Sequence, residues 1–94
     1  MASLSVSVIS PEKVLFEGEV ESVVAPAFDG EVGILPNHAP MVTLLGKGTL
    51  RLGDGGRAGR YVIEGGFLQV ADNQVRVVTE RATDNAQTGQ LPEK

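Results

Sequence analysis

The stretch Ser3-Leu4-Ser5-Val6-Ser7-Val8 decides the fold class, because apolar and hydroxyl side chains alternate in it one by one. An alternation of period two is typical of a strand with one face in the core and the other in water. Ser10-Pro11 ends the pattern, since proline has no N–H to donate to a sheet ladder. The opening residues therefore predict a half-buried strand that ends before Pro11.

The same period continues outward along the chain. The segment Val14–Ala25 predicts one long strand, with Gly18 as a bulge where it bends. Gly53–Gly59 predicts a hairpin loop, and Asp72-Asn73 predicts a two-residue turn because both residue types tolerate a positive φ. Shorter strands are expected at Val32–Leu35, Met41–Leu45, Gly48–Leu52, Tyr61–Glu64, Gly66–Ala71 and Gln74–Glu80.

No apolar stripe with the 3.6-residue period of a helix runs along the chain. About eight to ten short strands separated by turn signals indicate an all-β fold, either a sandwich or a barrel. The alternation stops after Ala82. We expect one β domain over residues 1–84 and a flexible polar tail over residues 85–94.

The composition excludes several classes of function. The 94 residues include no cysteine and one histidine, so we expect no metal site and no other cofactor. Eight basic against twelve acidic residues give a net charge of −4, which disfavours nucleic acids and anionic membrane surfaces as partners. No apolar run approaches the ~20 residues of a membrane span, and the start lacks the pattern of a signal peptide. We therefore expect no direct membrane insertion.

The loop Gly53-Asp-Gly-Gly-Arg-Ala58 fits the degenerate dinucleotide-binding pattern G-x-G-x-x-A. Such a pattern holds a pyrophosphate only where a helix begins directly after it. The strand-like residues Arg60-Tyr-Val-Ile63 follow here instead. We interpret the loop as the tip of a hairpin.

His38 and three glutamates are the candidates for catalysis. A catalytic histidine needs an oriented nucleophile or carboxylate, so a small hydrolase that uses His38 stays an alternative to a histidine that serves a hydrogen bond or an interface. Glu17, Glu19 and Glu21 share one strand face at a spacing of about 7 Å. We interpret them as a solvated face, with the docking of a basic partner as the alternative. No catalytic residue is assigned.

The segment Gly30-Glu-Val-Gly-Ile-Leu-Pro-Asn-His-Ala-Pro40 is the most informative loop. Its two prolines fix φ and restrict Leu35 and Ala39 to extended shapes, while its glycines permit tight returns. A loop that is already ordered loses little entropy on docking, so it suits contact with another protein. A rigid connector that only closes the fold is the equal alternative.

In this loop the sequence resembles the signature of the epsilon subunit of F-type ATP synthases. The agreement covers about residues 4–84, in content and in order. That family has a flattened β-sandwich, so the resemblance favours the sandwich over the barrel. The resemblance is carried by Val8–Glu12, Phe16, Gly18, Gly30–Pro40, Thr43, Leu45, Gly65–Phe67, Val70, Asn73, Val75, Val77 and Thr79–Ala82.

The resemblance also implies a role. It implies a non-catalytic rotor subunit of the central stalk that binds the gamma subunit and the membrane c-ring and couples ion-driven rotation to ATP synthesis. It implies a protein that is peripheral on the cytoplasmic side of a bacterial inner membrane and monomeric when isolated. It implies a gamma interface at Ser10, His38, Ala39, Met41 and Thr43, and a c-ring interface at Phe28, Asp29, Gly30, Glu31 and Val32.

One feature departs from the family's pattern. Full-length members carry a carboxy-terminal helical hairpin, whereas here Asp84-Asn-Ala-Gln87 leads into a short polar stretch. We expect a short form with neither the inhibition nor the ATP sensing of that hairpin. The alternative function is a β-sandwich protein- or carbohydrate-binding module with an unrelated partner, although four aromatic residues leave few platforms for a sugar ring.

Overall fold

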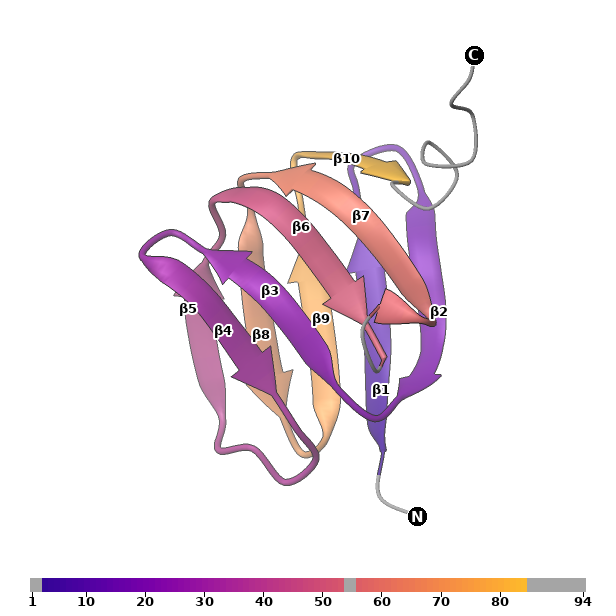
Figure 1. The fold of residues 1–94 in the computed structure, drawn as a ribbon, viewed down its shortest axis with the longest axis vertical. Coiled ribbons are helices and arrows are strands. Elements are labelled where there is room, and N and C mark those ends of the chain that lie inside the picture. The colour runs from indigo at the N-terminus through magenta and orange to yellow at the C-terminus, as the bar shows by residue number, and fades with distance from the viewer. Residues whose placement is uncertain (1–2, 54–55, 85–94) are drawn as a thin grey trace.

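The computed structural model describes residues 3–53 and 56–84, which form ten strands and no α-helix. The strands make two five-stranded sheets packed face to face (Figure 1). Sheet A has the order β2-β1-β9-β8-β5 and sheet B the order β10-β7-β6-β3-β4. The strands are β1 Leu4–Ile9, β2 Val14–Val20, β3 Val23–Ala27, β4 Gly30–Ile34, β5 Met41–Leu44, β6 Lys47–Leu52, β7 Gly59–Glu64, β8 Phe67–Ala71, β9 Gln74–Val78 and β10 Arg81–Asp84.

The sandwich confirms the all-β prediction and decides between sandwich and barrel. In β1, Leu4, Val6 and Val8 are buried, as their alternation with serine predicted. The other strands add their inner faces, and the core lies between the two sheets. The buried apolar side chains are Leu4, Val6, Val8, Val20, Val23, Ala25, Ile34, Leu45, Leu50, Leu52, Tyr61, Ile63, Leu68, Val70, Val75 and Val77.

The prediction of one strand over Val14–Ala25 is wrong. The segment forms β2 in sheet A and β3 in sheet B, and the chain crosses between the sheets at residues 21–22. Gly18 is not a bulge, because it pairs regularly with Val6. The irregularity lies at Leu15, where the register passes from Val8↔Phe16 to Ile9↔Val14. Crossing the sandwich exchanges the inner and outer faces, which is why the apolar set changes parity at Val23.

The predicted strand Gln74–Glu80 is shorter in the structure, because β9 ends at Val78. Sheet A keeps β9, and residues 81–84 return in sheet B as β10, a strand that the sequence did not predict. Thr79 lies at this second crossing and is buried, with its hydroxyl 3.0 Å from the carbonyl oxygens of both Gly65 and Arg81. A buried hydroxyl needs such a partner, so the contact stabilises the passage of the chain between the sheets.

The turns agree with their sequence signals. Asp72 and Asn73 have φ values of 52° and 61° and connect β8 to β9 as a two-residue turn. The loop with the G-x-G-x-x-A pattern connects the antiparallel strands β6 and β7, and residues 54–55 of it lie outside the described residues. The predicted tail over residues 85–94 also lies outside them.

Gly66 is the glycine on which the closure of the sandwich depends most. Its φ is 108°, and a Cβ there would lie 2.0 Å from the carbonyl oxygen of Val78. We predict that Gly66→Ala lowers the free energy of unfolding by at least about 2 kcal/mol, because the clash adds to backbone strain. Gly33→Ala is the matched control, since nothing lies within 4 Å of a Cβ at that position. Urea unfolding measures both, and equal stability of the two variants would contradict the account.

Candidate functional site

The predicted c-ring residues lie in and directly after the β3–β4 turn. Phe28 is 68% exposed, and its backbone N–H donates to the Leu44 carbonyl across 3.1 Å, so the turn is attached to the end of β5. Glu31 is on β4, at the edge of sheet B, and pairs with Arg51 of the same chain at 3.2 Å. An exposed pair of this kind contributes at most about 1 kcal/mol. Because of this pair, a basic group of another protein would have to compete with Arg51 for the Glu31 carboxylate.

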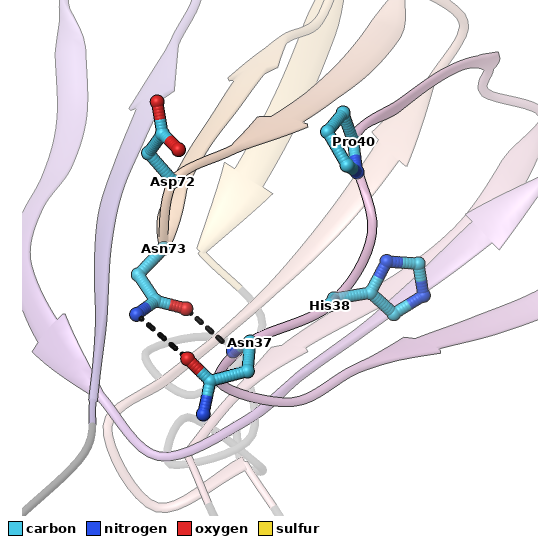
Figure 2. A pocket seen from close by; sticks show the side chains of 5 residues that line it. All are labelled: Asn37, His38, Pro40, Asp72 and Asn73. Atoms are coloured by element: carbon cyan, nitrogen blue, oxygen red, sulfur yellow. Dashed lines mark hydrogen bonds between the residues drawn. The ribbon is translucent and has the colours of Figure 1, made fainter.

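The predicted gamma residues His38 and Ala39 lie at the opposite end of β4, in the loop that leads to β5. Asn37 in this loop has a φ of 69°, and its backbone N–H donates to Oδ1 of Asn73 in the β8–β9 turn. Asn73 in return donates to Oδ1 of Asn37 across 3.4 Å (Figure 2). The side chain of Asn73 therefore holds the loop by two hydrogen bonds, one from the backbone N–H of Asn37 and one to its side chain, in agreement with a rigid segment.

Met41 and Thr43 face inward rather than outward. They pair with the buried residues Val70 and Leu68, and Met41 packs against the core. Their neighbours Val42 and Leu44 face outward and are 67% and 63% exposed. On β5, another protein can therefore reach Val42 and Leu44, whereas the predicted Met41 and Thr43 face the core.

Ser10 lies away from His38. It follows Ile9 at one end of β1, whereas the His38 loop is attached to Asn73, which lies beside Ser5 at the other end. Five residues of strand separate these ends by about 17 Å. Ser10 also caps its own turn, since its Oγ accepts from the backbone N–H of Lys13 across 3.3 Å. The structure does not gather the five predicted gamma residues into one spot.

The surroundings of His38 bear on the hydrolase alternative. The ring's Nδ1 lies 2.7 Å from the Ala39 carbonyl oxygen, and the ring points away from Asp72 across a shallow hollow (Figure 2). Within residues 3–53 and 56–84, no serine, threonine or carboxylate makes a hydrogen bond with this ring.

The described residues contain no group of three His, Cys, Asp or Glu side chains that could hold a metal ion. No helix of the described chain is long and apolar enough to cross a membrane.

The sequence analysis missed an apolar row on the outer face of sheet A. Its members are register partners on successive strands, and none is charged. Each follows or precedes an apolar residue that faces the core or packs against it, so the row is marked in the sequence by five apolar doublets that interrupt the alternation. We call this set the outer apolar row: Leu44 of β5, Phe67 of β8, Val78 of β9, Ile9 of β1 and Val14 of β2.

Fold and surface together define a ten-stranded β-sandwich whose exposed features, in the part described, are the outer apolar row, turns, edges and surface hollows. Residues 3–85 match the family model of the ATP synthase delta/epsilon chain, β-sandwich domain. The chain therefore belongs to the family of ATP synthase epsilon chains.

Individual relatives agree with this assignment. The ATP synthase epsilon chain of Leptospira borgpetersenii is 52% identical over 77 residues, which are 82% of this chain and 61% of that protein. The chain thus spans about three fifths of the length of such curated relatives. The epsilon chain of Caulobacter vibrioides is 40% identical over 86 residues, which are 92% of this chain and 100% of that protein.

A solved structure has the same fold. A chain in the cryo-EM structure of the Euglena gracilis mitochondrial ATP synthase, described as OSCP/F1/c-ring, matches with a TM-score of 0.79 and 26% identity. The match covers 96% of this chain and 61% of that chain. The two findings, in sequence and in fold, agree on the family.

The hydrogen bonds between Asn37 and Asn73 allow the rigidity of the His38 loop to be tested. We predict that Asn73→Gly raises the amide hydrogen-exchange rate of Asn37 about tenfold, because one hydrogen bond is worth about 0.5–1.5 kcal/mol. Glycine adopts the turn's positive φ readily, so the turn itself persists. Asn73→Asp keeps the acceptor oxygen and is expected to keep the protection. Equal exchange in both variants would show that the loop is rigid for another reason.

Proposed function

We propose that this chain is a non-catalytic rotor subunit of the ATP synthase central stalk. It binds the gamma subunit and the c-ring and so couples ion-driven rotation to ATP synthesis. The match of residues 3–85 to the delta/epsilon sandwich domain carries the proposal. The exposed turns and outer row support it, because a joint that transmits torque needs contact area on rigid elements.

The c-ring interface is proposed at residues 28–32. Phe28 projects at the tip of the β3–β4 hairpin, and the strand pairing of β3 with β4 makes that tip stiff. Since Glu31 already has Arg51 as a partner, the apolar ring of Phe28 is the principal contact and the charge pair sets register.

The gamma interface is proposed at Ser10, His38, Ala39, Met41 and Thr43. The structure supports different roles for these residues. Ala39 is exposed and His38 is half buried in a loop that is already ordered, so they contact the partner directly. Met41 and Thr43 support β5 from its inner face while Val42 and Leu44 present the strand outward.

The proposed location is peripheral, on the cytoplasmic side of a bacterial inner membrane, as part of the assembled synthase. The isolated chain is proposed to be a monomer without ATPase activity. Reconstitution tests the function: membrane vesicles stripped of their epsilon chain receive the purified chain, and ATP synthesis driven by an ion gradient is measured. Recovery of synthesis is expected. Absence of both recovery and gamma binding would contradict the proposal, as would ATP hydrolysis by the pure chain.

The c-ring contact is tested by a pair of substitutions on the same hairpin. We predict that Phe28→Asp weakens binding of the chain–gamma complex to detergent-solubilised c-ring by about tenfold or more, because it removes a central aromatic contact. Glu31→Gln is expected to change the affinity less than about threefold, since exposed charge pairs contribute little.

Phe28 is exposed and the Glu31–Arg51 pair contributes at most about 1 kcal/mol, so thermal unfolding should show both variants folded. If Glu31→Gln proved the more damaging of the two, charge rather than apolar contact would hold the ring.

A further inference from the structure

None of the five residues of the outer apolar row belongs to the gamma or c-ring interface proposed above. It crosses all five strands of sheet A without a charged side chain, in a chain with a net charge of −4. Leu44 and Val14 at its two ends are 63% and 54% exposed, and Phe67 between them is 38% exposed. Neighbouring strands lie about 4.8 Å apart, so the row is about 19 Å long.

We propose that the outer apolar row receives one amphipathic helix of the gamma subunit. The inference rests on the proposed function and adds the surface and the kind of element that docks on it. The row connects two of the proposed gamma residues, since Thr43 precedes Leu44 and Ser10 follows Ile9. It therefore joins β5, whose Thr43 faces inward, to the end of β1 beside Ser10 by one outer surface.

A helix fits the row because of its width and its hydrogen bonds. The row is one side chain wide, whereas a second sheet would need an apolar face several rows deep. The backbone groups of the interior strands of sheet A already pair within the sheet. An extended segment lying across them would leave its own N–H and C=O groups without partners, and a helix satisfies them internally. About 13 helical residues span about 19 Å at about 1.5 Å per residue.

The irregularity at Leu15 completes this surface. With regular alternation, Val14 would point inward together with Phe16. The extra residue lets Val14 pair with Ile9 instead, on the outer face, while Leu15 packs against the core. A bulge of this kind re-aims a side chain, and here it extends the row to the last strand of the sheet.

Charges beside the row indicate the chemistry of the helix. The next row toward the β8–β9 turn contains Arg76 of β9 and Glu17 of β2, both exposed. Within the described part of the chain, neither makes an ion pair. We expect the helix to carry an acidic residue facing Arg76 and a basic residue facing Glu17, which would fix its direction.

Two other occupants fit less well. A stable interface between two copies needs about 800 Å² from each, and five side chains, three of them partly covered by neighbours, do not provide that area. The chain's own residues 85–94 contain a single large apolar residue, Leu91, and cannot supply an apolar stripe.

Substitution tests the surface. Leu44→Glu is expected to raise the dissociation constant for the purified gamma subunit of a bacterial ATP synthase about tenfold or more. Val62→Glu is the matched control, because Val62 alternates with the buried Tyr61 and Ile63 on β7 and so faces outward from sheet B, on the other side of the sandwich from the row. It should change the constant less than about threefold. Thermal unfolding of both variants verifies the fold.

Photo-crosslinking tests the helix. A p-benzoyl-phenylalanine is placed at position 44 and, separately, at position 14, and the products with gamma are mapped by mass spectrometry. Both should map to one helical segment, with attachment points about 13 residues apart.

The outcomes separate the two proposals. If the unsubstituted chain does not bind gamma at all, the proposed function fails. If it binds, and Leu44→Glu binds equally well or the crosslinks map to different segments, the docking proposal fails and the function stands. Crosslinks between two copies of this chain would show that a dimer occupies the row and would also overturn the docking proposal.

Discussion

Burial of one face of every strand is the constraint on which the rest of the molecule depends. Small domains of this size have little area to spare, so the inner faces of both sheets must be apolar and closely packed. Leu4, Val6 and Val8 meet that need in β1, and Leu50, Leu52 and Ile63 meet it in the opposite sheet. What a partner can recognise is therefore limited to the outer faces, the edges and the turns.

The elements that follow from local rules could be predicted from the sequence. The alternation of Ser3–Val8 located β1 and its inner face, and Asp72-Asn73 located a turn with positive φ at both residues. The fold class followed from the number and spacing of such segments. The prolines of Gly30–Pro40 predicted a rigid loop; in the structure residues 30–34 form β4, and hydrogen bonds to Asn73 hold the loop that follows.

The points where the chain changes sheets could not be located in the same way. A crossing at residues 21–22 or at Thr79 depends on contacts between segments far apart in the sequence, such as the hydroxyl of Thr79 with Gly65. The placement of the candidate site depends on the same crossings. Met41 was predicted at an interface but faces inward, because the register with Val70 sets its side. The apolar doublets are visible in the sequence. Interpreted as strands that carry apolar side chains on both faces, they predict the outer apolar row.

In the proposed function, one face of sheet A and the β3–β4 hairpin are the two contact surfaces of a rotor joint. The backbone hydrogen bond from Phe28 to the Leu44 carbonyl attaches the hairpin to the end of β5, a strand of sheet A. A cryo-EM structure of this chain bound to gamma and c-ring tests that account most directly. The account predicts a gamma helix over sheet A and the Phe28 turn against the ring. A complex in which both surfaces face solvent would contradict it.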